Sequence, residues 1–236
     1  VPAMKIYAIR FYHNGIPVKD IIVSLDKELK KLVKLPKSLP QFSPPQHFDD
    51  VHVLVYSLTK QTNIKKTPDI AELAIHASNK LEYSKSLIGK EITLKDIAPF
   101  QLVDVRGLTK GRGFQGAVKR YGISFKQHKS EKGRRRPGSL GPWHPARVTF
   151  RTPMAGQLGM YTRIHYNQKV VTTGNIVEKD INKKGGFTHF GVLKSNYILL
   201  QGSVQGPVKR QVLLTPSMRP TKKQEKKKFE FQEIVQ

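Results

Sequence analysis

Cysteine is absent from the 236-residue chain, which excludes disulfide bonds and thiolate metal sites. No apolar run approaches the roughly 20 residues that a membrane-spanning helix requires. Acidic residues are scarce, since 17 Asp and Glu stand against 42 Lys and Arg. The formal net charge of +25 therefore points to a polyanionic partner, with nucleic acid first and an anionic membrane surface second.

Basic residues are concentrated in the second half of the chain. Residues 1–100 contain fifteen Lys or Arg and ten acids, a net charge of +5, whereas residues 101–236 contain twenty-seven and seven, a net charge of +20. The most basic stretch, residues 105–151, holds thirteen Lys or Arg and a single acid, Glu131. Its Gly and Pro residues interrupt helices and strands, and its scattered apolar residues cannot form a core. We expect the arm, residues 106–151, to become ordered only against negative charge from outside the chain.

Residues 1–95 have the pattern of an α+β segment. Aromatic and β-branched residues predict strands at residues 4–12, 51–56 and 70–75. The Pro-rich residues 35–46 predict an extended loop. Since the chain opens on Val1 rather than Met, we expect the start of the gene product to lie outside this sequence.

Two helices are predicted within this segment. Residues 24–34 form an amphipathic pattern, with Ser24 as the N-cap and Pro36 beyond the end. Residues 78–90 form the second pattern, and Gly89 suits a C-terminal cap.

The remaining residues predict a second region, 96–215, made of short strands and interrupted by the arm. Strand patterns occur at residues 92–94, 100–105, 148–150, 161–166, 169–177, 189–193, 197–202 and 210–214. Short strands at such spacing favour a closed barrel or a sandwich. Residues 216–236 contain two prolines and a run of lysines, and predict an extended basic tail.

The glycines at 111, 113 and 116 match the spacing of a dinucleotide-binding fingerprint. We reject this interpretation, because the fingerprint requires a helix that opens at the third glycine. Gly122 follows six residues later, and no apolar stripe develops between them. No acid lies about 20 residues further on to bind a ribose. The glycines instead favour close approach of the backbone to a sugar-phosphate chain, and no cofactor is expected.

The eight His residues form none of the spacings typical of metal sites. His144 has no nearby acid except Glu131, so it is better explained as a surface or stacking residue than as a catalytic base. The single Trp, Trp143, would ordinarily belong to a core. Its position between Gly-Pro and His-Pro in the most basic segment favours an exposed tip, where Trp stacks on bases or fills a pocket of a partner.

The Arg cluster at 134–136 is a candidate phosphate-binding site. A solvated surface normally mixes charges of both signs, whereas this region is almost purely positive. Arg offers planar paired donors that match phosphate, and Lys contributes point charge.

Three segments resemble one known family: T-K-G-R-G-F-Q-G-A-V-K-R-Y-G at 109–122, G-S-L-G-P-W-H-P-A-R-V at 138–148, and A-G-Q-L-G-M-Y-T-R-I-H-Y-N at 155–167. They are similar to the large-subunit ribosomal protein L-three family of the archaeal and eukaryotic type. Further matches lie at 81–92, 183–192 and 202–210, so the resemblance covers most of residues 78–220. Relatives usually carry Trp where Tyr121 stands.

The resemblance implies a mainly β fold with α+β additions, in which a translation-factor-type β-barrel carries a long basic extension. It further implies that this extension reaches through large-subunit ribosomal RNA toward the peptidyl-transferase centre and supports assembly. Family members have an additional basic N-terminal segment in the barrel, so an incomplete barrel is expected if it is absent. The implied partners are large-subunit ribosomal RNA and neighbouring ribosomal proteins. The implied location is the ribosome in the cytoplasm, and the resemblance implies that the protein is not an enzyme. The predicted RNA contacts are Lys110, Arg112, Lys119, Arg120, Arg134, Arg135, Arg136, Trp143, His144 and Arg147, with Lys222 and Lys223 in the tail.

Two other classes of function remain as alternatives. An RNA-modifying or nucleotide-using enzyme on a translation-type barrel requires a carboxylate or nucleotide loop near the basic residues, and a nucleotide-binding assay would separate it. A general DNA-compacting or membrane-surface protein would bind duplex DNA or anionic vesicles as well as ribosomal RNA.

Overall fold

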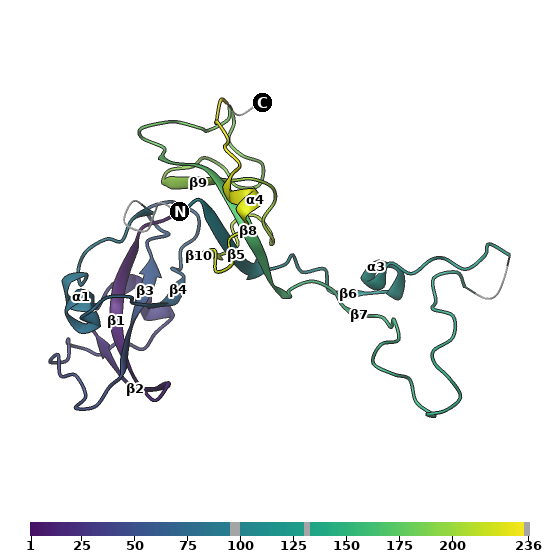
Figure 1. Cartoon of the computed structure of the whole chain (residues 1–236), viewed down its shortest axis with the longest axis horizontal. Helices are drawn as coiled ribbons and strands as arrows, with labels where there is room; N and C mark the ends of the chain where they lie inside the picture. Colours follow the sequence, from purple (N-terminus) through teal and green to yellow (C-terminus); the bar gives the residue numbers. More distant parts are fainter. Residues whose placement is uncertain (95–99, 130–132, 234–236) are drawn as a thin grey trace. The chain divides into compact units, whose positions relative to one another are not determined.

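The computed structural model describes residues 1–94, 100–129 and 133–233. Regular structure consists mainly of β-strands with a few short helices (Figure 1), which confirms the mainly β fold with α+β additions. The chain divides into two compact units. The first comprises Val1–Leu102, Lys169–Gln201 and Pro220–Gln236, and the second comprises Val103–Gln168 and Gly202–Arg219. The division into domains at residues 95 and 215 stays a prediction.

A four-stranded antiparallel sheet in the order β2-β1-β3-β4 organises the first unit. Its strands are β1 (Met4–His13), β2 (Ile16–Ile22), β3 (Asp50–Ser57) and β4 (Ile70–Ala74). β1, β3 and β4 confirm predicted strands, whereas sequence reasoning missed β2. The signal for β2 was the Asn14-Gly15 pair, a strong hairpin turn. Both residues have positive φ, 49° and 74°, which Asn and Gly tolerate best.

Both faces of this sheet are buried. Ile6, Ile9 and Phe11 of β1 pack on one face, while Tyr7 and Ala8 pack on the other. This order departs from strict alternation because the pairing register between β1 and β3 shifts between Ile6 and Ala8, and such a bulge moves later side chains to the opposite face. The result is a core on each side of the sheet.

The predicted helix at residues 24–34 is wrong. Only a 3-10 helix, η1 (Lys27–Lys31), forms there, and Asp26 rather than Ser24 precedes it without a side-chain cap. Leu29 is fully buried and Val33 is partly buried against the same core cluster, but Leu32 is 47% exposed, so only part of the apolar stripe is covered. Repulsion among four lysines spaced three or four residues apart opposes a longer helix.

The second predicted helix is confirmed as α1 (Lys80–Ser86). The Asn79 side chain accepts a hydrogen bond from the Glu82 N–H at 3.4 Å, and therefore caps the N-terminus. Ser84 is fully buried, and its hydroxyl donates to the Leu81 carbonyl at 2.7 Å. Gly89 has a φ of 79°, which suits the turn that follows the helix. The Pro-rich residues 35–46 contain no helix or strand, as predicted.

A second four-stranded sheet has the order β10-β5-β8-β9. Its strands are β5 (Leu102–Leu108), β8 (Thr162–Asn175), β9 (Asn196–Leu200) and β10 (Val212–Pro216). β8 joins two strands that were predicted separately, at 161–166 and 169–177. In the second unit, the fully buried carboxylate of Asp104 accepts the backbone N–H groups of Asn167 at 2.9 Å and of Met218 at 3.3 Å.

Two predicted strands do not form. Residues 148–150 are irregular, because Val148 is 51% and Phe150 92% exposed and no partner strand covers them. Residues 189–193 are also irregular, since the Phe187 N–H donates to the Gly191 carbonyl and closes a tight turn. Of residues 92–94, only Ile92 forms an isolated bridge, with Met4.

The tail is not wholly extended, contrary to the prediction. A short helix, α4 (Lys222–Glu225), forms within it. The ammonium of buried Lys169 donates to the Glu225 carbonyl at 3.0 Å. The Lys179 Nζ atom lies 4.6 Å from the centroid of the Phe231 ring. These contacts hold the tail to the rest of the first unit.

Candidate nucleic-acid interface

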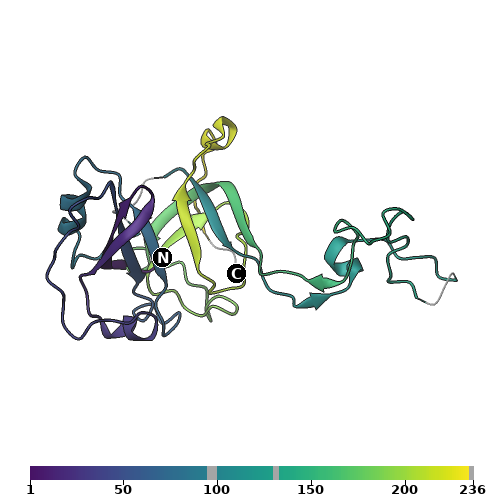
Figure 2. The same ribbon diagram turned by 90° about the horizontal axis from the view of Figure 1, so that it is seen from below.

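Residues 109–161 form a finger that leaves β5 and returns at β8 within the second unit (Figure 2). Its base is a stem of two antiparallel segments, residues 109–115 and 156–161. Within the stem, β6 (Phe114–Gln115) pairs antiparallel with β7 (Gly156–Gln157). The Arg112 N–H donates to the Leu158 carbonyl at 2.9 Å, and the Leu158 N–H donates to the Gly113 carbonyl at 2.9 Å. The stem thus has backbone hydrogen bonds of its own. The sequence prediction, in which the arm becomes ordered only against charge from outside the chain, did not foresee them.

Glycines allow the two chains of the stem to approach closely. Gly159 has a φ of 83°, and a Cβ atom there would lie 2.1 Å from the Lys110 carbonyl oxygen. A Cβ atom on Gly111 would lie 2.9 Å from Cγ of Met160. At these positions the glycine is required by contact within the chain, in addition to any contact with a ligand.

A helix does open after Gly116, which was not expected. It is α3 (Ala117–Tyr121), and it ends at Gly122 with a left-handed φ of 70°. Arg120 of this helix donates through Nε to the Gln157 carbonyl at 3.0 Å and through Nη1 to the Met154 carbonyl at 2.9 Å. Arg120, a predicted RNA contact, therefore also holds α3 to the segment that leads back to β8.

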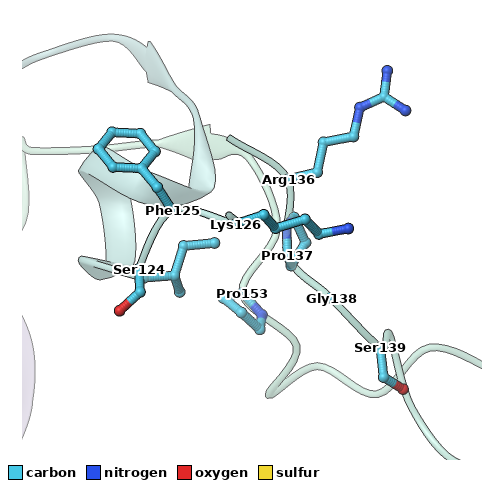
Figure 3. A pocket seen from close by; sticks show the side chains of 9 residues that line it. Ser124, Phe125, Lys126, Arg136, Pro137, Gly138, Ser139 and Pro153 are labelled. Carbon is cyan, nitrogen blue, oxygen red and sulfur yellow. The ribbon is translucent and has the colours of Figure 1, made fainter. Parts of the chain in front are cut away.

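The distal loop, residues 122–155, is held by fewer contacts. The Lys126 N–H donates to the Arg134 carbonyl at 3.1 Å. The Cζ atoms of Arg134 and Arg135 lie 5.7 and 5.1 Å from the centroid of the Phe125 ring, within the range of cation–π attraction. Of these residues, Phe125 and Lys126 line a pocket (Figure 3).

The most exposed aromatic side chains among the described residues of the finger are those of Trp143, Phe114 and Phe150. Trp143 is 88% exposed, and its ring centroid lies 6.4 Å from that of His144. Phe114 and Phe150 are 77% and 92% exposed, and sequence reasoning missed both as candidates. The argument that singled out Trp143, an aromatic residue within a basic segment, applies equally to them.

The charge of the finger is of one sign. Its described residues include eleven Lys and Arg and no Asp or Glu, since its one acid, Glu131, lies outside the described residues. By contrast, the nine ion pairs between described residues all lie between Lys5 and Glu91. Most of the basic side chains of the finger are exposed to solvent, and none of these nine ion pairs includes a residue of the finger.

The predicted RNA contacts are distributed along the finger rather than gathered at one point. Lys110 and Arg112 lie on the stem, and Lys119 and Arg120 on α3. The distal loop carries the remaining candidates of the arm, namely Arg134, Arg135, Arg136, Trp143, His144 and Arg147. Lys222 and Lys223 lie on α4, in the first unit.

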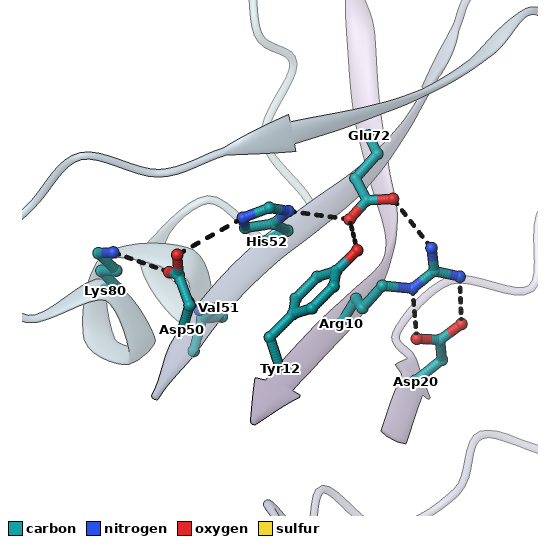
Figure 4. A network of polar contacts seen from close by, with 8 residues as sticks. All are labelled: Arg10, Tyr12, Asp20, Asp50, Val51, His52, Glu72 and Lys80. Atoms are coloured by element: carbon teal, nitrogen blue, oxygen red, sulfur yellow. Dashed lines mark hydrogen bonds and ion pairs between the residues drawn. The ribbon is translucent and has the colours of Figure 1, made fainter. Parts of the chain in front are cut away.

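The first sheet shows how charge is balanced where acids are available (Figure 4). Arg10 forms a paired contact with Asp20 at 2.8 and 2.7 Å and reaches Glu72 at 2.9 Å. Nδ1 of His52 lies 2.8 Å from the same Glu72 carboxylate, and Lys80 lies 2.7 Å from Asp50. Arg10, His52 and Lys80 are thus engaged by carboxylates of their own unit.

The pKa values of two of these carboxyl groups, Asp50 and Glu72, are lowered. The hydrogen bond from Lys80 is the main cause that lowers the pKa of Asp50 below its ordinary value. Burial alone would raise the pKa of Glu72, but hydrogen bonds from Tyr12 and His52 and the charge of Arg10 outweigh it, so that pKa is also lowered. Both groups are held in the charged form.

Within residues 1–94, 100–129 and 133–233, no three His, Cys, Asp or Glu side chains are arranged to hold a metal ion. In the same part of the chain, no helix has the length and apolar character needed to cross a membrane.

Comparison with known proteins places these features in a family. The family model described as Ribosomal protein L3 matches residues 30–234. The large ribosomal subunit protein uL3 of Methanocaldococcus jannaschii is 41% identical, over 84% of this chain and 62% of that protein. Proteins of the same name from Thermoplasma acidophilum and Methanocella arvoryzae are 38% and 35% identical, over 90% and 93% of this chain and 68% and 71% of theirs. The matched region contains the whole finger, and the chain belongs to the ribosomal protein L3 family.

Proposed function

We propose that this chain is a structural protein of the large ribosomal subunit and binds large-subunit ribosomal RNA through its finger. The observation that carries the proposal is the finger's charge: eleven Lys and Arg and no acid among its described residues. RNA supplies phosphates that neutralise such a surface with release of counterions. The relatives' name, large ribosomal subunit protein, supports this choice of RNA.

The finger offers two kinds of contact to RNA. Four exposed cations are available to phosphate groups, because their side chains point into solvent from the stem, α3 and the distal loop. They are Lys110, Arg112, Lys119 and Arg147. Trp143 and His144 present exposed rings, and unstacked bases of folded RNA stack on such rings. The other proposed contacts are the Arg cluster 134–136, the donors of Arg120 that do not bond within the chain, and Lys222 and Lys223 on α4.

We infer from family membership that the distal loop reaches toward the peptidyl-transferase centre and supports subunit assembly in the cytoplasmic ribosome, beside neighbouring ribosomal proteins. The second sheet is proposed as part of a translation-factor-type β-barrel, supported by its contiguous β10-β5-β8-β9 order. No catalytic residue is assigned. An RNA-modifying enzyme would require a carboxylate beside the basic groups, and the finger's sequence has only Glu131.

Binding of the full chain to four polyanions at equal salt tests the proposal. We expect archaeal large-subunit ribosomal RNA to bind more tightly than small-subunit ribosomal RNA, duplex DNA or anionic vesicles. The affinity should fall with salt by a log–log slope of about −0.7 to −0.9 for each phosphate contact. Equal affinity for DNA or vesicles would contradict the proposal.

A charge-matched pair of variants locates the contact. Reversal of Arg134, Arg135 and Arg136 to Glu should weaken RNA binding strongly and reduce the salt slope. The same change at three exposed lysines of the first unit, Lys30, Lys31 and Lys34, should weaken it much less. Equal losses would show that only net charge matters.

A further inference from the structure

A small pocket lies in the distal loop of the finger. Three stretches of chain contribute to it, and its volume is about 210 Å³. The lining comes from residues 123–126, residues 136–139 and Pro153. This volume is below the 300–1,000 Å³ (approximately) of common ligand pockets, so the pocket accepts a group the size of one ring system.

The three consecutive arginines beside the pocket have different surroundings. The guanidinium groups of Arg134 and Arg135 lie over the Phe125 ring, and Nε of Arg134 also donates to the Lys126 carbonyl at 3.4 Å. Arg136 lines the pocket, and its guanidinium has no hydrogen bond or ion pair with any described residue. Arg134 and Arg135 therefore contact the Phe125 ring, which lines the pocket, while the donors of Arg136 remain available to a ligand.

The lining combines flat apolar surfaces with cations. Ile123, Pro137 and Pro153 supply apolar surfaces, and the extended side chains of Lys126 and Arg136 carry their charges beyond the proline rings (Figure 3). No described residue of the finger is acidic, so the described lining offers no counter-charge to a cationic ligand. A planar apolar ring joined to an anion matches both parts of the lining.

We propose that this pocket holds one unpaired nucleotide of the bound RNA, with its base against the proline and isoleucine surfaces and its phosphate on Arg136. This inference rests on the proposed RNA-binding function and assigns one nucleotide-sized subsite within it. Proteins recognise RNA chiefly through such unstacked nucleotides, because the grooves of the RNA duplex present little sequence information. Arg136 contributes a planar pair of donors that a lysine cannot reproduce.

Two variants test the subsite in the full chain. Arg136→Lys keeps the charge but removes the planar donors. Gly138→Leu adds a side chain at the pocket wall, where a Cβ atom meets no atom within 4 Å and the backbone is not left-handed. The matched control is Arg151→Lys, which changes an exposed arginine of the same loop that neither lines the pocket nor belongs to the proposed RNA contacts.

The measurement is chemical footprinting of archaeal large-subunit ribosomal RNA, with affinity measured in parallel. We expect one unpaired nucleotide, protected by the unaltered chain, to become reactive in Arg136→Lys and in Gly138→Leu, with affinity about tenfold weaker, the scale of one stacked base. Arg151→Lys should keep that protection. If both pocket variants retain every protection, or if the control loses the same nucleotide, the subsite is refuted. If the unaltered chain itself shows no preference for this RNA, the proposed function fails instead.

Discussion

Nε of Arg120 donates to the backbone carbonyl of Gln157 at 3.0 Å, across 37 residues of sequence. The contact joins the outgoing and returning chains of the finger at the end of the stem. It shows that a cation in a polyanion-binding segment also serves the local fold. The stem has no hydrophobic core, so its order depends on hydrogen bonds of this kind and on the close approach of its glycines.

Arg120→Ala should loosen the finger locally. It removes two hydrogen bonds to backbone carbonyls, at a cost of about 1 kcal/mol, because the site is partly open to solvent. We expect faster amide hydrogen exchange at Arg112 and Leu158, with no change in the melting temperature of the first unit. Lys119→Ala, at the exposed neighbour, is the control. Unchanged exchange in the Arg120 variant would show that the contact does not stabilise the stem.

Two stem glycines separate backbone strain from steric clash. Gly113 and Gly159 both have positive φ, 65° and 83°, but only Gly159 lies against backbone, where a Cβ atom would meet the Lys110 oxygen at 2.1 Å. Gly113→Ala should cost about 1 kcal/mol through strain alone, and Gly159→Ala should cost clearly more and disrupt the stem. Amide exchange in residues 109–115 measures both. If Gly113→Ala and Gly159→Ala change amide exchange equally, the two segments of the stem are not in the close contact described here.

Much of the first unit could be predicted from the sequence, because its elements obey local rules. β1 and β3 are rich in β-branched and aromatic residues, and the face of α1 that was predicted to be covered includes the buried Ser84. The predicted helix at 24–34 does not form, because the core covers Leu29 fully and Val33 partly and leaves Leu32 exposed. Propensity cannot determine which residues of a stripe will be covered.

The candidate site was predictable in composition but not in contacts. Charge and glycine content identified the finger and the exposed Trp143. The distinct surroundings of Arg134 and Arg136 depend on the position of the Phe125 ring, which no spacing in the sequence reveals. The same holds for the tail, since the contact between Lys169 and Glu225 spans 56 residues.

The carboxylate network of the first sheet should make stability depend on acidity. Asp50 and Glu72 have pKa values below their ordinary 3.8 and 4.5. A group with a lowered folded pKa stabilises the fold above its unfolded pKa, and the contribution is lost as the pH falls through the folded value. The melting temperature should therefore fall as the pH drops below about 4.5. Glu72→Gln should lower stability at neutral pH and flatten this acid dependence, whereas Glu82→Gln, on α1, should leave it unchanged. An unaltered pH profile in Glu72→Gln would contradict the role given to this network.

Trp143→Ala should separate folding from binding. The side chain is 88% exposed, so its removal takes little buried surface from the fold, and the melting temperature should not change. Stacking of one base on an aromatic ring contributes about 1–3 kcal/mol, and affinity for large-subunit ribosomal RNA should fall accordingly, at least about fivefold. Trp143→Phe should recover most of the loss, because it restores an aromatic face. The control is Tyr83→Ala, at an aromatic residue of α1 that is 50% exposed. If Trp143→Ala binds large-subunit ribosomal RNA as tightly as the unaltered chain does, the Trp143 ring does not stack on a base. The exposure of Trp143 then has a cause other than the proposed RNA contact.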